Sequence, residues 1–213
     1  MTQIKKFTFN PFQENTYLLY DKSMECVVID PGNSNAQENI EIAEFIESES
    51  LELKLVLNTH CHIDHVLGNA YFHEKYGLKP WIHEKDLVVL HALTQYGEMF
   101  GVPVNDSPEP QGFLNEGKSV RFGNTELEVM HIPGHAPGHV VFINRNDNTV
   151  IGGDVLFYGS IGRTDLPYGD HETLIQSIKK KLFALSDDFE VHPGHGPKTT
   201  IGFERKNNPF LQS

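Results

Sequence analysis

Apolar and polar residues alternate along this chain in short runs that predict strands in two batches. The first batch comprises three runs near the N-terminus, separated by turn residues, at 4–9, 15–20 and 26–30. "LELKLVLN" at 51–58 is apolar enough for a strand that is buried on both faces. Four strand candidates then follow one another in the C-terminal half: "SVRF", "TELEVMHI", "HVVFIN" and "TVIGGDVLF". Two shorter strands are expected in "LKPWIH" and "FEVHPGHG".

Helical periodicity lies between and after these batches. Residues 36–47 place apolar side chains on one stripe, and Asn35 is among the preceding residues that offer an N-cap. Further helices are expected in three places: ending near Tyr76, over 84–100, and after Asp170. Residues 103–118 are rich in Pro, Asn, Asp and Gly and predict a loop that borders a pocket. Strands in batches separated by helices favour a layered α/β fold, with two sheets packed together and helices outside.

Length and composition narrow the class of protein. The 213 residues, of which 38% are hydrophobic and 22% charged, suit one well-packed core, so a single domain spanning 1–213 is predicted. A formal net charge of −12 without a block of Lys or Arg argues against nucleic acid or an anionic membrane as partner. The chain has no membrane-spanning run and no leader-like start, so we expect a cytoplasmic location, with Cys26 and Cys61 reduced.

The candidate chemistry is concentrated in "THCHIDHVLGN" at 59–69, directly after the apolar run. Residues two apart on an extended chain point to the same side, so His60 and His62 converge and form half of a divalent metal site. Asp64 and His65 come after the chain has begun to turn and can face a neighbouring position. Alternation points Cys61 away from the histidines, which favours structural burial for its thiol.

The remaining ligands are expected from three later motifs. The tripeptide Pro-Gly-His occurs twice after a strand candidate, ending at His135 and at His195. Pro and then Gly suit the central positions of a type II turn, which projects the next side chain from the strand end. Asp154 follows two glycines that allow close backbone approach, and its carboxylate has two oxygens that can bridge two cations. The histidines that flank these motifs are expected to hydrogen-bond the backbone: His131, His139 and His192.

These motifs, in this order, resemble the metallo-β-lactamase superfamily. The resemblance extends from "VVIDPG" to His195 and implies an αββα four-layer sandwich with the site along one sheet edge. By position, it implies one metal on His60, His62 and His135. It implies a second metal held by the following residues: Asp64, His65 and His195, with Asp154 bridging. Asp30 matches an early aspartate that supports the ligand loop.

Within that superfamily, the chain is similar to glyoxalase II-type hydrolases, which open thioesters such as S-lactoylglutathione. The segments at 152–170 and 191–211 carry this similarity to a small single-domain bacterial branch. Glyoxalase II has Gly-Lys-Phe-Tyr where this chain has Gly-Arg-Thr-Asp at 162–165, so the thiol carrier stays open. Arg163 either binds a substrate carboxylate or pairs with Asp165. Tyr158 is predicted to line the pocket, whereas Phe157 is expected in the core.

The resemblance implies a metal-dependent hydrolase that acts on a small molecule. Two ions about 3.5–4 Å apart generate a bridging hydroxide at neutral pH and polarise a carbonyl. A thiol, with a pKa of about 8.5, leaves as thiolate without a general acid. Asp64 and Asp154 are the predicted catalytic carboxylates, and Asp64 would orient the hydroxide. Zinc is the predicted ion, with iron and manganese as alternatives, and the oligomeric state is left open.

The main alternative is a persulfide dioxygenase with a single iron. Members of that branch also carry "THCH" followed by Asp-His, and a Gly-Arg-Thr-Asp motif. Iron would there use two histidines and one carboxylate, here His60, His135 and Asp154. A zinc-stabilised protein without catalysis is less favoured, because structural zinc sites are typically closed and rich in cysteine.

Overall fold

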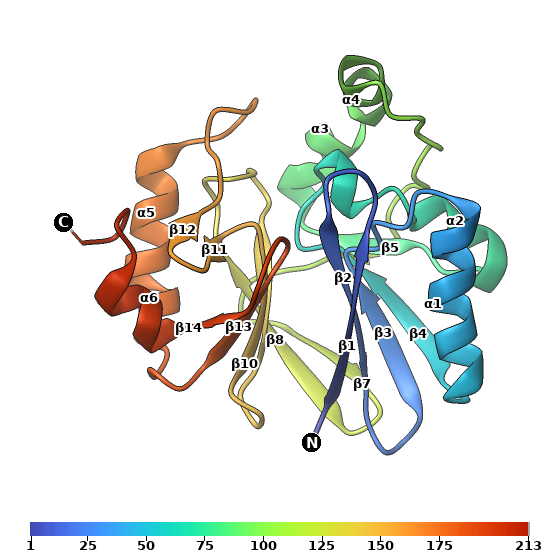
Figure 1. Cartoon of the computed structure of the whole chain (residues 1–213), viewed down its shortest axis with the longest axis horizontal. Helices are drawn as coiled ribbons and strands as arrows, with labels where there is room; N and C mark the ends of the chain where they lie inside the picture. Colours follow the sequence, from blue (N-terminus) through green and yellow to red (C-terminus); the bar gives the residue numbers. More distant parts are fainter. Residues whose placement is uncertain (213) are drawn as a thin grey trace.

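The computed structural model describes residues 1–212, in which two six-stranded sheets pack face to face between two groups of helices (Figure 1). Helices α1 (Ala36–Ser48) and α2 (Asn69–Tyr76) cover the outer face of the first sheet. Helices α5 (His171–Lys180) and α6 (Ile201–Asn207) cover that of the second. The predicted αββα sandwich is confirmed.

The first sheet is formed by the N-terminal half of the chain in sequence order. Its strands are β1 (Gln3–Phe9), β2 (Glu14–Tyr20), β3 (Glu25–Ile29), β4 (Glu52–Leu57), β5 (Pro80–Ile82) and β6 (Gly112–Phe113). The first three strands pair antiparallel, and β3 to β6 pair parallel. Because parallel strands end at the same edge, the loops after β3, β4 and β5 lie together there.

The second sheet has the order β14-β13-β10-β9-β8-β7. Its strands are β7 (Ser119–Phe122), β8 (Thr125–His131), β9 (Val140–Asn144), β10 (Thr149–Gly153), β13 (Glu190–Pro193) and β14 (Thr199–Thr200). The run at 149–157, expected as one strand, is divided between β10 and a small hairpin of β11 (Leu156–Phe157) and β12 (Ser160–Ile161). The division falls at Gly153, whose φ of +47° turns the chain out of the sheet.

The prediction of one continuous helix over 84–100 is wrong. The segment is divided into a 3₁₀ turn η2 (Glu84–Asp86), α3 (Leu87–Leu90) and α4 (Leu93–Phe100). The N–H of Ala92 bonds to the carbonyl of Val89, three residues back, which tightens the chain into a turn between the two helices. Two further 3₁₀ turns are η1 (Ile63–His65) and η3 (Leu182–Ala184). The N-cap expected at Asn35 is present, and Asp170 caps the helix that follows it.

Strand alternation explains the layered core. On β2, Tyr17 and Leu19 face the second sheet, whereas Leu18 between them faces α1. On β9, Val140 and Phe142 likewise fill the space between the sheets, and the alternate residues pack beneath α5. Both sheets are therefore buried on two faces, and the polar side chains gathered at their common edge are held by a rigid frame. Within residues 1–212, none of the helices is both long and apolar enough to cross a membrane.

At the opposite end of the sandwich, Asp21 ties the β2–β3 turn of the first sheet to the β7–β8 turn of the second. Its carboxylate accepts hydrogen bonds from Ser23, from the backbone N–H of Asn124 (2.8 Å) and from Thr125 Oγ1 (2.8 Å). Burial opposes ionisation, but these donors lower the pKa of Asp21 from 3.8 to about 2.

We expect Asp21→Asn to lower the free energy of unfolding by about 1–2 kcal/mol at pH 7 without changing turnover. Because the folded-state pKa is depressed, this contribution is present above the unfolded pKa of 3.8 and is lost as the pH falls towards 2. Denaturant unfolding of both proteins between pH 7 and pH 2 measures the difference. A difference that stayed constant over this range would contradict the role of the ionised carboxylate.

Candidate metal centre

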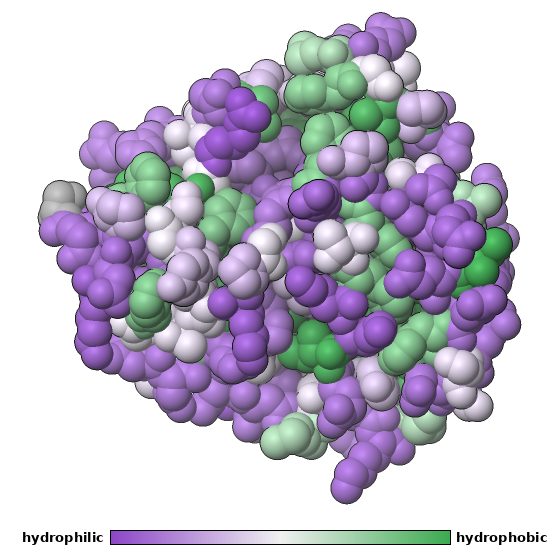
Figure 2. Space-filling view, in the orientation of Figure 1, coloured by the Kyte–Doolittle hydropathy of each residue, from purple (hydrophilic) through white to green (hydrophobic). Residues whose placement is uncertain are grey.

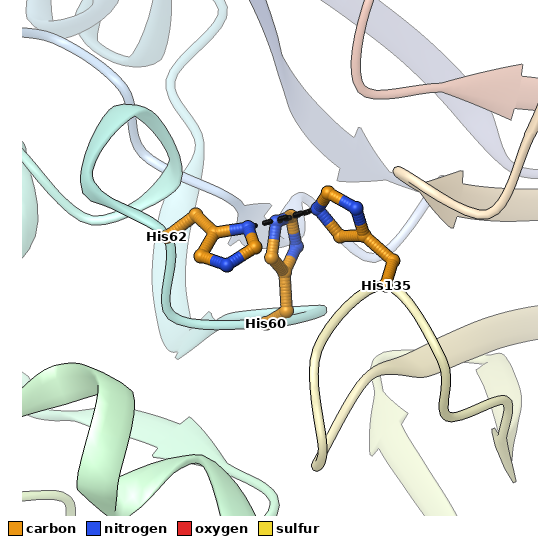
Figure 3. A group of neighbouring side chains, drawn as sticks. All are labelled: His60, His62 and His135. Atoms are coloured by element: carbon orange, nitrogen blue, oxygen red, sulfur yellow. Dashed lines mark hydrogen bonds between the residues drawn. The ribbon is translucent and has the colours of Figure 1, made fainter. Parts of the chain in front are cut away.

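Three histidines converge at the common edge of the two sheets (Figure 3). His60 and His62 leave β4 in extended form, and His135 follows β8 across the site. The distance from His62 Nδ1 to His135 Nε2 is 2.8 Å, and that from His135 Nε2 to His60 Nε2 is 3.2 Å. All three imidazoles are buried. Three nitrogens pointing at one another at these distances are typical of a tripod that shares a cation.

A second group lies beside the first. Asp64 and His65 belong to η1, the turn that follows His62, and His195 comes from the end of β13. Asp64 Oδ2 lies 3.1 Å from His195 Nε2 and 3.6 Å from His65 Nε2. Among residues 1–212, these three residues and the three histidines of the first group both meet the geometry of a metal site. The structure thus places the residues of this short loop in two groups, with His60 and His62 in one and Asp64 and His65 in the other.

Asp154 lies between the two groups, at the turn after β10. Its Oδ1 lies 3.4 Å from His65 Nε2, and its Oδ2 lies 3.6 Å from His135 Nε2 and 3.5 Å from His195 Nε2. One carboxylate thus faces ligands of both groups. This is the position predicted for a bridging ligand.

The outward ring nitrogens hold the imidazoles in orientation. His135 Nδ1–H donates to the carbonyl of Arg163 (2.7 Å). Asp30 lies 3.1 Å from His65 Nδ1, and it also accepts the backbone N–H and the hydroxyl of Thr59, both at 2.6 Å. Since that hydroxyl donates to Asp30, it accepts from His60 Nδ1 at 3.0 Å. Each contact leaves the inward nitrogen free to bind a cation, as the hydrogen-bond partners of metal-binding histidines commonly do. Asp30 thus has the predicted supporting position.

The acidic side chains around His65 favour the binding of a cation at the centre. Four carboxylates surround the ring of His65 within 4 Å: Glu14, Asp30, Asp64 and Asp154. Burial opposes protonation, yet Asp64 and Asp154 raise the pKa of His65 well above its ordinary value. Burial lowers the pKa of His62 to about 3, with His135 adding to the effect. His65 Nε2 and Asp154 Oδ1 are buried without a hydrogen-bond partner in the described structure. Buried imidazole nitrogens and carboxylate oxygens that lack hydrogen-bond partners are suitable ligands for divalent ions.

Two residues whose full roles the sequence patterns did not predict hold the ligand loops in place. Asp86 in η2 is fully buried and accepts the N–H of Cys61 (2.8 Å) and of Gly138 (2.5 Å), which joins the loops carrying His60 and His135. Burial raises the pKa of Asp86 to about 7, and the two N–H donors oppose this rise. In the sequence, Asp86 stands out only as an acidic residue after a strand, and that position suits the surface of a helix equally well.

The other is His139, which was expected only to bond the backbone. Its ring stacks on His60 with centroids 4.6 Å apart, and its Nε2 accepts the N–H of Asp154 (3.0 Å). It therefore positions a ligand of the first group and the carboxylate between the groups. His131 also bonds the backbone as expected, at the carbonyl of Pro137 (2.9 Å). For His192, the structure gives a contact with the Tyr17 ring and no hydrogen bond at Nε2.

We expect Asp86→Asn to weaken metal binding at the first group roughly 10- to 100-fold, the range found when residues that support metal ligands are changed. One amide oxygen can replace one carboxylate oxygen, but the NH₂ group then faces a backbone N–H that loses its acceptor. Competition with a chelator measures the affinity. The exposed Glu84, in the same turn, gives the matched control Glu84→Gln. Equal affinities of the two variants would contradict the role of Asp86.

A cavity of about 410 Å³ opens above the centre. Five of the predicted ligands line it: His62, Asp64, His135, Asp154 and His195. Arg163 lines it too, but its guanidinium is bound to Asp165 by two hydrogen bonds of 2.7 Å. The prediction for Tyr158 is not supported, because its ring is exposed and stacks on Phe203 outside the lining. Phe157, expected in the core, takes that place, since β11 directs alternate side chains to opposite sides.

Comparison with known families agrees with this geometry. The profile of the metallo-β-lactamase superfamily matches residues 9–196, most of the chain and all of the ligand motifs. The chain belongs to the metallo-β-lactamase superfamily. This superfamily member is 41% identical over 204 residues to hydroxyacylglutathione hydrolase GloC of Haemophilus influenzae, covering 95% of this chain and 94% of that protein.

Two solved structures of the superfamily are similar over almost the whole length. BLEG-1, a B3 metallo-β-lactamase, superposes with a TM-score of 0.90 at 34% identity, covering 99% of this chain and 100% of that one. TTHA1623, solved in a di-iron-bound form, superposes with a TM-score of 0.88 at 37% identity, covering 97% and 100%. The likeness confirms the fold, and it implies divalent metals without fixing whether they are zinc or iron.

Proposed function

We propose that this superfamily member is a binuclear metal-dependent hydrolase of thioesters, similar to glyoxalase II, with zinc as the ion. The observation that carries the proposal is the meeting of two ligand groups at Asp154 beneath one cavity. The identity to GloC supports a small acyl-thiol as substrate, such as S-lactoylglutathione.

In such a reaction, different residues of the chain would bind the ions and orient the attacking oxygen. His60, His62 and His135 would hold one ion and Asp64, His65 and His195 the other. Two divalent ions held there would supply a water of lowered pKa and polarise a substrate carbonyl. The carboxylate of Asp64 lines the cavity. It would orient the attacking oxygen by accepting a hydrogen bond from it. A sulfur leaving group departs as thiolate, so the chain needs no residue that protonates it.

The sharpest competitor is an iron-dependent persulfide dioxygenase, which needs only His60, His135 and Asp154. The second group favours two ions, because the ligand atoms of Asp64, His65 and His195 lie within 4.8 Å of one another beside the first group. Two assays on the purified protein of known metal content distinguish the two activities. One records thiol release from S-lactoylglutathione, and the other records oxygen uptake with glutathione persulfide.

Two metal ions per chain with thiol release and no oxygen uptake are expected. One iron per chain with oxygen uptake would overturn the proposal. Two bound ions with neither activity would also overturn it, in favour of a binding protein.

A further inference from the structure

The cavity above the metal centre is apolar on both of its flanks. On one side stand Phe12 from the β1–β2 loop, and Tyr96 and Phe100 from α4. On the other stand Phe157, Ile161 and Leu166, from the small hairpin and the loop that follows it. Its floor is the ligand set itself. A group attached to a carbonyl that reacts at the centre therefore lies against hydrocarbon on either side.

The α4 flank is built into the fold. The rings of Phe12 and Phe100 meet edge to face with centroids 5.9 Å apart, so two distant segments share the wall. Gly97 packs so closely on the loop after α4 that an added Cβ would lie 2.6 Å from Val104. Phe100 nevertheless stays 43% exposed, with its ring on the cavity. Figure 2 shows hydrophobic side chains gathered over α4 on the surface of the molecule.

The lining has no cation free for a charged ligand. Arg163 is the only Lys or Arg in the part of the lining that the structure describes, and Asp165 already occupies its guanidinium. The net charge of −12 adds negative potential to the surface around the metal centre. Carboxylates or phosphates of a thiol carrier therefore lack partners inside the cavity and belong at its open mouth. The terminal acyl group is the part of a thioester that can remain inside.

We infer that the cavity receives an apolar, uncharged acyl chain, so that thioesters with acyl groups longer and less polar than lactoyl are hydrolysed more efficiently than a lactoyl ester. The inference rests on the proposed thioester hydrolysis and adds to it the class of acyl group. The apolar flanks bind the chain by the hydrophobic effect while the carbonyl lies at the metal centre. Specificity thus comes from the acyl chain and not from the thiol.

The test compares acetyl, butyryl and hexanoyl thioesters of glutathione, and the same acyl groups on uncharged N-acetylcysteamine, with the metal-loaded protein. We expect kcat/KM to rise about fourfold for each methylene that enters the cavity, on both thiols alike. Equal values for the three acyl groups, or a dependence on the thiol alone, would overturn the inference and leave thioester hydrolysis standing. If no thioester were cleaved, the proposed function would fail, and the inference with it.

Variants on α4 test the wall itself. Phe100→Ala should weaken the chain-length dependence, so that the ratio of kcat/KM for hexanoyl over acetyl falls roughly tenfold. Met99, the preceding residue, is 72% exposed and lies outside the lining, so Met99→Ala is the matched control and should keep the wild-type ratio. The same ratio in both variants and the wild type would overturn the inference. Circular dichroism and metal content confirm that each variant is folded and loaded.

Discussion

Replacing Asp154 with asparagine is expected to lower kcat/KM on thioesters by far more than the roughly 10- to 100-fold typical of changes to residues that only support a metal ligand. The two oxygens of Asp154 face His65 on one side and His135 and His195 on the other. Asparagine has the same size but only one oxygen, and its NH₂ group cannot bind a cation. Although burial opposes ionisation, His65 and the other imidazoles hold the pKa of Asp154 far below its usual range. Asp154→Asn therefore removes a negative charge that the carboxylate carries at any working pH.

The measurement is metal content together with thiol release. Asp154→Asn should bind fewer than two ions per chain and lose turnover in step. The exposed Asp188, which precedes β13 at the end of the strand away from His195, gives the control Asp188→Asn, which should keep both. An Asp154→Asn protein with two ions and wild-type turnover would show that this carboxylate does not bridge.

The second large effect is expected from a single methyl group at Gly194. A Cβ at this position would lie 2.6 Å from His65 Cε1 and closer still to Asp154 Oδ1. The backbone cannot yield, because Gly194 donates to Gly153 (2.8 Å) and accepts from Asn15 (2.7 Å). Gly194→Ala should therefore displace ligands of the second group and reduce turnover more than a hundredfold.

Gly196, two residues further on, provides the matched control. Its φ of +72° makes alanine strained, but no atom lies within 4 Å of the added Cβ. Gly196→Ala should lower the free energy of unfolding by about 1–2 kcal/mol and keep both metals. Metal analysis and thermal unfolding of the two variants separate loss of the site from loss of stability. Full metal occupancy in Gly194→Ala would contradict the close packing at this position.

The ligands could be predicted from the sequence because each follows a strand within a short motif. Alternation assigned His60 and His62 to one side of the chain, and the turn after them assigned Asp64 to another. The repeated Pro-Gly-His motif marked His135 and His195 as side chains projected from strand ends. Strand ends in a layered fold meet at one edge, so local patterns marked these residues as candidates, and the resemblance to the superfamily implied how they divide between two ions.

The supporting and substrate-facing residues could not be predicted in this way. Asp86 acquires its role only when the N–H groups of Cys61 and Gly138 reach it from two other loops. The division of 84–100 into separate helices, which presents Phe100 to the cavity, depends on tertiary packing that periodicity does not report. The exchange of Phe157 for Tyr158 follows from the short hairpin, whose start within an apolar run left its facing direction undetermined.

The number of ions that activity requires tests the central claim most directly. Metal-free protein is titrated with Zn²⁺ while thiol release from a thioester is recorded. If both ligand groups serve one reaction, activity rises until two equivalents per chain have been added and then stays level. Full activity at one equivalent, or no thiol release at any ratio, would contradict a binuclear thioester hydrolase.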